Sequence, residues 1–429
     1  MATEAQPRRR RDRKIQLAVL AADLFRQRGY HAVGISDIAS AAGITGAAVY
    51  RHYSNKQEIL AQVLLTSVDT LADTVRRVLH PAPGDIAGTA SATASAEPDR
   101  RMSALVDALA RLAVERRDAV ALWRWLGRHL DRERQLEVRR RGEAPMLDWA
   151  AELRRQRPAL SAAESELLCL AAMGVFASPA DHRVTLGKER HVQLLSGLAG
   201  AVLGCDVDAG RPDAGEDTSP KQLPSRPESG DSPLAASRRE RLLAEASRLF
   251  RKRGYHAVTM EDIGAAAGIA GPSVYRHFAS KSDLLRSAST RMADRLSHDA
   301  ARATAGAASA TESLDRLVDC YAEAIWDNRD LITVYLNELA GLPEAQRAQL
   351  RRLQRGYVTE WVRLMRAARP GLTTAEARVV VQAALTVAND LARTGRTRGR
   401  PHLAQEIASL MRAVTQASCL PAGESGEEA

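Results

Sequence analysis

The 429-residue sequence is poor in aromatic residues, which make up only 4% of the chain. Leu, Ala and Val must therefore fill the interior, and a composition rich in Ala, Leu, Arg and Glu favours helices. Its four cysteines lie far apart, without a CxxC motif or a Cys/His cluster: Cys169, Cys205, Cys320 and Cys419. This spacing argues against a disulfide framework or a metal site and predicts idle thiols in a reducing cytosol.

Long apolar runs and catalytic motifs are missing as well. The longest apolar stretch, residues 194–205, is shorter than the ~20 helical residues that cross a bilayer, and no signal peptide precedes the basic start. The chain contains no HExxH, GxSxG or phosphate-loop motif, and no acid/base pair recurs in both halves beyond the stretch around 35–56 and its counterpart. We therefore expect a cytoplasmic protein without membrane contact that is not an enzyme and needs no cofactor or metal.

Charge is unevenly distributed along the chain. The formal net charge is +9, the stretch "RRRRDRK" at 8–14 is strongly basic, and residues 206–231 lean acidic. A basic surplus suits a polyanionic partner such as DNA, but a basic arm can equally be a solvated tail. Both interpretations of 8–14 stay open at this point.

The hexapeptide "RGYHAV" occurs twice, at 28–33 and 253–258. With an offset of 225, residues 13–60 align without gaps onto 238–285, and 25 of the 48 pairs are identical. At an offset of 212 the similarity continues, since Trp149 aligns with Trp361 and "RPAL" at 157–160 with "RPGL" at 369–372. The chain is therefore a duplication, with a period too long for a solenoid.

Apolar periodicity predicts that both halves are entirely helical. Leu17, Ala21 and Phe25 share one helical face, as do their counterparts in the second half, and no alternating strand pattern is present. Residues 206–236 contain five prolines amid Gly, Ser and Asp, which is typical of a flexible linker. Further helices are expected near 56–79, 101–115, 118–130, 132–156, 162–177 and 188–204, and near 281–303, 312–327, 331–341, 344–367, 374–394 and 402–417.

Residues 35–53, "ISDIASAAGITGAAVYRHY", have the features of two short helices that cross over a tight turn. Such a crossing needs a small residue where the axes approach, a turn residue that tolerates positive φ, and a branched apolar plug. Ala39, Gly43 and Val49 supply these in the first half, and Gly264, Gly268 and Val274 in the second. An ordinary corner between two helices is the alternative to a helix-turn-helix.

The combined pattern "GYHAV…DIA…AAGI…VYRHY…K" resembles the DNA-binding domain of tetracycline-repressor (TetR) family regulators, over about 48 residues in each half. Two copies in one chain look like the tandem TetR regulators of actinobacteria, some of which control lipid and steroid operons. The resemblance implies a recognition helix in the major groove, with Tyr, His and Lys side chains on phosphates: Tyr50, His52, Lys56, Tyr275, His277 and Lys281. It also implies base-edge positions at Thr45, Gly46, Ala47, Ala48 and Arg51, and at Ala270, Gly271, Pro272, Ser273 and Arg276. Buried structural histidines are the alternative for His52 and His277.

Two departures from the family pattern distinguish the halves. Thr259 and Asp262 form the capping box that the family usually has before "DIA", whereas Gly34 in the first half lacks the cap oxygen and the phosphate contact implied for Thr259. Conversely, Thr45 can cap the first recognition helix, where the second half has Ala270 followed by Pro272 in the first turn. We expect two readers that are not interchangeable.

The C-terminal regions resemble the family only in length and helix count. The family dimerises through two C-terminal helices, for which 165–176 with 191–203 and 376–388 with 403–414 are the candidates; as plain core helices they need no partner. Aromatic and Met side chains are candidates for an apolar ligand pocket, with ordinary core packing as the alternative. They are Trp123, Trp125, Met146, Trp149, Met173 and Phe176, and Tyr321, Trp326, Tyr335, Tyr357, Trp361 and Met365.

We therefore expect an all-α protein of two tandem TetR-like halves, each with a helix-turn-helix domain and a helical effector/dimerisation domain, packed as an internal pseudo-dimer. Its expected parts are a basic arm (1–12), first DNA-binding domain (13–60), first effector domain (61–205), linker (206–236), second DNA-binding domain (237–285), second effector domain (286–420) and tail (421–429). The expected function is a ligand-responsive repressor on an asymmetric operator, with further pairing of pseudo-dimers left open. A DNA-binding architectural or interaction module without an effector is the alternative, and an enzyme on a helical scaffold is a third.

Overall fold

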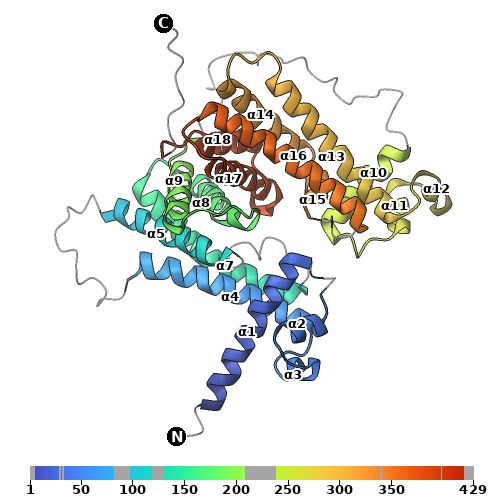
Figure 1. Cartoon of the computed structure of the whole chain (residues 1–429), viewed down its shortest axis with the longest axis horizontal. Coiled ribbons are helices and arrows are strands. Elements are labelled where there is room, and N and C mark those ends of the chain that lie inside the picture. Colours follow the sequence, from blue (N-terminus) through green and yellow to red (C-terminus); the bar gives the residue numbers. More distant parts are fainter. Residues whose placement is uncertain are drawn as a thin grey trace. The chain divides into compact units, whose positions relative to one another are not determined.

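The computed structural model of the chain describes residues 5–28, 30, 33–81, 97–117, 130–207, 238–337, 339, 342–397 and 399–419. Within these residues the secondary structure consists of helices and turns, with no strand (Figure 1). Contacts between Cα atoms divide the chain into two compact units. Unit 1 comprises Met1–Cys205, Met365–Leu391 and Leu410–Ala429, and unit 2 comprises Asp206–Leu364 and Ala392–Ser409. The prediction of an all-α fold is confirmed.

The helices of the first half agree with the predicted spans. They are α1 (Ala5–Arg28), α2 (Ile35–Ala41), α3 (Gly46–Tyr50), α4 (Lys56–Leu79), α5 (Glu97–Glu115), α7 (Arg132–Gln156), α8 (Ala162–Ala177) and α9 (Lys188–Leu203). Most of the helix predicted near 118–130 lies outside the described residues. The basic run at 8–14 lies within α1, whose backbone is helical from Ala5, because Arg and Lys are good helix formers.

The second half follows the same order. Its helices are α10 (Arg238–Arg253), α11 (Met260–Ala267), α12 (Gly271–His277), α13 (Lys281–Thr304), α14 (Ala310–Asp327), α15 (Arg329–Asn337), α16 (Glu344–Ala368), α17 (Thr374–Arg393) and α18 (Leu403–Thr415). Residues 208–237, which hold most of the expected linker, and the expected tail at 421–429 lie outside the described residues. No helix in the described part of the chain combines the length and the apolar character that a membrane crossing requires.

Each N-terminal three-helix domain has a small core of its own, built from the predicted apolar stripe. Leu17, Ala21 and Phe25 of α1 are at most 2% exposed and pack with Ile38 and Val49 of the next two helices. The second half repeats this core with Leu242, Ala246, Phe250, Ile263 and Val274. Truncating a buried Phe to Ala typically costs about 3–5 kcal/mol, so these stripes hold the three helices together.

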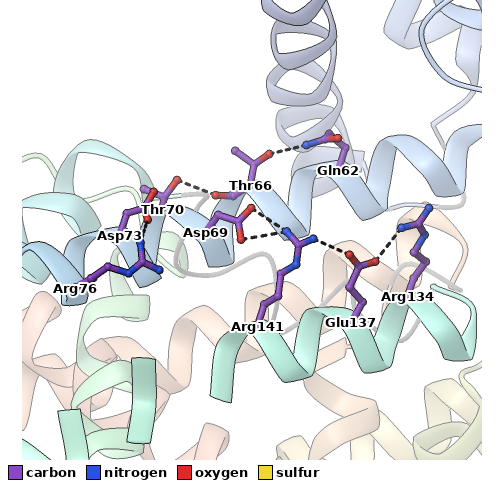
Figure 2. A network of polar contacts seen from close by, with 9 residues as sticks. All are labelled: Gln62, Thr66, Asp69, Thr70, Asp73, Arg76, Arg134, Glu137 and Arg141. Carbon is purple, nitrogen blue, oxygen red and sulfur yellow. Dashed lines mark hydrogen bonds and ion pairs between the residues drawn. The ribbon is translucent and has the colours of Figure 1, made fainter. Parts of the chain in front are cut away.

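Helix α4 continues from the first three-helix domain into the rest of unit 1, where it packs against α7. Arg141 of α7 donates to Asp69 of α4 at 3.1 Å and to Glu137 at 2.8 Å, and Arg134 also donates to Glu137 at 2.8 Å (Figure 2). Both arginines are more than 40% exposed, so each surface pair contributes only about 0–1 kcal/mol. Burial of α4's apolar face supplies most of the contact.

Unit 1 also contains most of α17, which lies against α8 and α9. Arg190 Nε donates to Glu376 Oε1 at 2.6 Å, and Thr386 Oγ1 donates to Asp181 Oδ2 at 2.9 Å. A Cβ atom on Gly174 would lie 3.0 Å from the Cα atom of Val387, so the α8 backbone passes very close to that of α17. The apolar stripe Leu195, Leu198 and Val202 on α9 is completely buried, and so is its counterpart on α18, Ile407, Leu410 and Val414.

Candidate nucleic-acid interface

The two helix-turn-helix elements, α2–α3 and α11–α12, share one turn geometry. Gly43 and Gly268 have φ values of 63° and 65°, in the left-handed region that glycine tolerates best. Directly after the turn, Ile269 N donates to Gly264 O at 2.8 Å, and the first half makes the equivalent bond at 3.0 Å. A Cβ on Gly264 would lie only 2.8 Å from Ile269 O and from Val274 Cγ2. The predicted roles of the small residue, the turn residue and the plug are confirmed.

The helix caps differ between the halves as the sequence predicts. Thr259 Oγ1 accepts a hydrogen bond from Asp262 N, and Asp262 Oδ2 accepts one from Thr259 N, which completes a capping box. In the first half only the return bond is present, from Gly34 N to Asp37 Oδ2 at 2.7 Å, because glycine has no side-chain oxygen. An ion pair from the end of the preceding helix reaches each aspartate, Arg28 to Asp37 and Arg253 to Asp262.

The caps of the two recognition helices are reversed. Thr45 Oγ1 accepts a hydrogen bond from Ala48 N at 3.3 Å, so α3 is capped by its own side chain. Ala270 provides no such bond for α12, where Pro272 occupies the first turn instead. Proline already has a helical φ and lacks the N–H that a first turn leaves unpaired. Each recognition helix therefore begins at the same place by a different chemical means.

The candidate DNA-contacting side chains lie on the surface of the two domains, outside their cores. Tyr50 and Tyr275 are 57% and 50% exposed, whereas Val49 and Val274 beside them are completely buried. The other exposed candidates are Thr45, Ala47, Arg51, Thr259, Ala270, Pro272 and Arg276. The half-buried candidates are Gly46, Ala48, His52, Lys56, Gly271, Ser273, His277 and Lys281. Each recognition helix thus presents one polar face and buries the opposite apolar one.

Lys56 has a structural role that sequence reasoning missed. Its Nζ donates to the carbonyl oxygens of Tyr30 at 2.8 Å and Val33 at 2.9 Å, and lies 4.3 Å from the centre of the Tyr30 ring. Desolvation by burial lowers the pKa of this ammonium. The second half repeats the arrangement, at 2.8 Å to both carbonyls, with Lys281, Tyr255 and Val258. We call each set the lysine clasp, because it holds the chain after the first helix against the start of α4 or α13.

An acidic residue distinguishes the surface of the second domain. Tyr275 Oη donates to Glu261 Oε1 at 3.3 Å, and the coulombic effect of this carboxylate raises the pKa of the phenol. The position equivalent to Glu261 in the first half is Ser36, which carries no charge beside Tyr50. The second recognition surface is therefore locally more acidic than the first.

A cation on the first helix covers an aromatic ring at the end of each recognition helix. Lys14 Nζ lies 4.8 Å from the centre of the Tyr53 ring, and Tyr53 Oη donates to Lys14 O at 2.8 Å. In the second half the guanidinium of Arg239 lies 4.2 Å from the Phe278 ring centre and donates to His277 O at 2.8 Å. Both members of this pair have changed between the halves, while their contact has been kept.

The candidate pocket residues that are described gather in the interior of each half. Trp149 and Phe176 stack with ring centres 6.3 Å apart, and Trp149 Nε1 donates to Met102 Sδ. In the second half Tyr321 lies 6.1 Å from Tyr357 and 5.8 Å from Trp361. Met173, Tyr335 and Met365 are buried, Met146 and Trp326 are half-buried, and Trp123 and Trp125 lie outside the described residues.

These candidates are distinct from the hollow that opens on the surface of α4. That hollow, of about 400 Å³, is lined by Thr70, Asp73, Arg76 and Arg77. In the described part of the chain no three His, Cys, Asp or Glu side chains are placed to hold a metal ion.

Fold and exposed polar face together define a tandem helix-turn-helix protein. The family model described as "Bacterial regulatory proteins, tetR family" matches residues 19–63 and again 242–288. The model described as "Tetracyclin repressor-like, C-terminal domain" matches residues 307–414. The chain belongs to the TetR family of bacterial regulatory proteins, with the N-terminal domain of that family present twice.

Similar proteins include both an activator and a repressor. Over 71 residues the chain is 41% identical to the HTH-type transcriptional activator FasR of Mycolicibacterium smegmatis, covering 17% of this chain and 32% of FasR. Over 121 residues it is 31% identical to the HTH-type transcriptional repressor KstR2 of Rhodococcus jostii, covering 28% of this chain and 59% of KstR2. The matches thus span less than two thirds of these relatives. The solved structure of the ketosteroid transcriptional regulator KstR2 of Mycobacterium tuberculosis aligns at 26% identity with a TM-score of 0.38, over 42% of this chain and 93% of that one.

Proposed function

We propose that the protein is a sequence-specific DNA-binding repressor in which one chain supplies both recognition helices of an operator complex. The observation that carries this proposal is the repetition of one exposed set on two scaffolds. Tyr, Arg, His and Lys recur at equivalent positions in the last part of α3 and α12 and just beyond them. By contrast, three of the four residues at the start of these helices differ, "TGAA" against "AGPS". Phosphate contacts carry no sequence information, whereas base contacts do. The shared residues therefore suit contacts with the DNA backbone, and the differing residues suit recognition of two different base sequences.

Thr45, Gly46, Ala47 and Ala48 are the base-facing positions in α3, and their small side chains let the helix approach the major groove. Arg51 and Arg276 are exposed at the other end of each recognition helix, and a guanidinium can bind a guanine with two hydrogen bonds. We assign Tyr50, His52, Tyr275 and His277 as phosphate donors, which is supported by the exposure of both tyrosines and by the position of both half-buried histidines outside the core clusters.

Packing of α17 on α8 supports an internal pseudo-dimer. At the offset of 212 that relates the C-terminal regions, Gly174 is equivalent to Thr386. Gly174 lies against Val387, the residue next to its own equivalent. Contacts of a residue with its own equivalent occur at the axis of a two-fold dimer. We infer that α8, α9, α17 and α18 form within one chain the four-helix interface that ordinary family members form between two chains.

Selection from random DNA tests this proposal. The wild type should return a site with two different half-sites about one helical turn, ~34–36 Å, apart, and native mass spectrometry should find one chain on it. Replacing residues 270–273 by "TGAA" should shift the preference towards a palindrome of the first half-site. A perfect palindrome for the wild type, or two separate homodimeric halves after cleavage at residue 220 with unchanged preference, would contradict the proposal.

The phosphate contacts have their own test. Tyr50→Ala together with Tyr275→Ala should weaken binding to all DNA sequences and leave the circular dichroism spectrum unchanged, because both side chains lie outside the core. Deleting residues 8–14 should reduce the dependence of affinity on salt if these basic residues contact DNA. Unchanged affinity in the first variant would remove the tyrosines from the interface.

We further propose that the interior aromatic residues bind an apolar effector that releases the operator. Tyr321, Tyr357 and Trp361 of unit 2 form one cluster of contacting rings. Its ligand is a small lipid-like molecule, recognised mainly by apolar area with a few polar groups. Screening such molecules by quenching of tryptophan fluorescence, then by release of operator DNA, tests this part; DNA binding that no apolar ligand changes would favour a module without an effector. We place the protein in the cytoplasm, where its operator would lie.

A further inference from the structure

Two histidines of unit 1 lie buried beside each other, far along the chain from the DNA-facing residues. His182 follows the last turn after α8, and His191 lies in the first turn of α9. Their ring centres are 6.0 Å apart with an interplanar angle of 28°. His182 is 9% exposed and His191 is 1% exposed, so neither ring has ready access to bulk water.

Three ring nitrogens of this pair have no hydrogen-bond partner among the described residues: His182 Nε2, His191 Nδ1 and His191 Nε2. Val184 N donates to His182 Nδ1 at 3.2 Å, so the proton of neutral His182 must be on Nε2. His191 likewise carries at least one N–H group. A buried donor without an acceptor costs about 1–3 kcal/mol, so a missing acceptor is the feature that needs an explanation.

Two arginines lie within electrostatic reach of these rings. Arg117 follows the end of α5, which packs on α9, and Arg378 lies in the first turn and a half of α17. Both side chains are half-buried, and neither makes an ion pair with the described residues. Burial, the other histidine, Arg117 and Arg378 lower the pKa of His182 to about 3. Burial and Arg117 lower that of His191 to about 4.

The nearby carboxylates already have other partners. Asp181, next to His182, accepts the hydrogen bond from Thr386 at 2.9 Å, and Glu376 accepts one from Arg190 at 2.6 Å. These same two bonds hold α17 against the residues adjoining both histidines, and Arg378 of the same helix acts electrostatically on His182. The cluster thus combines imidazole N–H donors with guanidinium groups, and in the described part of the chain it has no anionic partner of its own.

We propose that His182, His191, Arg117 and Arg378 form a binding site for a small oxyanion, either a phosphate or a carboxylate. An oxyanion supplies several acceptors at once, so it can accept hydrogen bonds from the buried N–H groups and pair with the guanidinium groups. A bound metal cation would be repelled by the same arginines, and no third metal-binding side chain joins the histidines in the described residues. The site is independent of DNA recognition, so its failure would leave the proposed function untouched.

Thermal unfolding of the full chain tests the site. Sodium phosphate and sodium acetate, each compared with sodium chloride at equal ionic strength and pH 7, distinguish an inorganic phosphate from a carboxylate ligand. An anion that binds only the folded state should raise Tm in a saturable way, by roughly 5 °C at a 100-fold excess over Kd. A rise with phosphate alone assigns the site to phosphates, and a rise with acetate alone to carboxylates.

Variants separate this site from the DNA-facing surface, where phosphate could also bind. Arg378→Gln and Arg117→Gln remove half-buried cations that make no ion pair with the described residues, so the variants should fold and lose at least four fifths of the saturable rise. Arg154→Gln, an exposed arginine of α7, is the matched control and should keep it. NMR spectra of the imidazole side chains should also move with the favoured anion. No saturable rise with either anion, or the same rise in Arg378→Gln as in the wild type, would overturn the proposal.

Discussion

Lys56→Met removes the ammonium of the first lysine clasp and keeps most of the side-chain volume. The wild-type ammonium donates to two carbonyl oxygens at 2.8 and 2.9 Å and lies over the Tyr30 ring. Because Lys56 is only half-buried, we take each charged hydrogen bond to contribute about 1–1.5 kcal/mol, at or just below the usual ~1.5–3 kcal/mol of bonds to charged groups. The ring contact adds about 0.5 kcal/mol. We expect the variant to lose about 2.5–3.5 kcal/mol of unfolding free energy.

Differential scanning calorimetry of the protein without DNA measures this loss. At about 2–4 °C per kcal/mol for a unit of this size, the transition that includes the first domain should move down by roughly 5–14 °C. Hydrogen exchange should speed up most at Val33 and the following turn, because these backbone groups lose their anchor. Lys281→Met should behave in the same way, since the second clasp has the same geometry.

Tyr50→Phe is the control, because its hydroxyl lies on an exposed side chain and its removal should change Tm by less than about 1 °C. The resemblance to the family implies instead that Lys56 contacts a phosphate, and its third N–H group leaves room for that contact as well. An unaltered Tm combined with a loss of DNA affinity in Lys56→Met would refute the clasp as a stabilising element and leave only the phosphate role.

Three further changes probe other parts of the molecule. Gly264→Ala should destabilise the second domain by about 1–3 kcal/mol, because the added Cβ would press on a carbonyl oxygen and on a buried valine. Chemical denaturation measures this loss, and an unchanged unfolding free energy would contradict the close packing. Thr259→Ala should cost about 1 kcal/mol through the lost cap, measurable in the same way, whereas Thr259→Ser should restore most of it. In phosphate-free buffer, stability should be complete above pH 6.5 and fall by up to about 1.4 kcal/mol per pH unit for each of His182 and His191 as pH drops towards 4. The unfolded state takes up these protons first, so a flat profile over that range in denaturant titrations would contradict the lowered pKa values.

Helix positions could be predicted closely because their signals are local and periodic. The predicted spans 56–79, 132–156 and 162–177 coincide with α4, α7 and α8. Asn55, Asp131 and Ser161 cap these helices, and the stretches that follow are amphipathic in α4 and apolar on nearly all sides in α8. The helix-turn-helix was predictable for a similar reason, because its small residue, turn glycine and apolar plug lie within eleven positions.

Contacts between distant residues could not be predicted from those signals. The clasp joins Lys56 to a carbonyl 26 residues earlier, and Tyr275 reaches Glu261 across the turn. Neither contact follows a helical period, and a lysine at the first position of a helix suggests solvent exposure. The histidine pair lies partly in a turn, where sequence spacing says little about which side chains meet. Only the three-dimensional packing of α17 brings Arg378 to them.

The cation–ring pair next to each recognition helix, Lys14 with Tyr53 and Arg239 with Phe278, determines where the two halves can be recombined. A chimera joined between positions 14 and 53 would set Lys14 against Phe278, or Arg239 against Tyr53, and in the first case the hydroxyl that binds the carbonyl of residue 14 would be missing. Recombination points therefore belong before the first helix and after the aromatic residue, so that both partners move together. Shorter exchanges confined to residues 270–273 leave this pair intact. The start of the recognition helix can thus be exchanged between the halves, whereas the first helix and the aromatic residue must come from the same half.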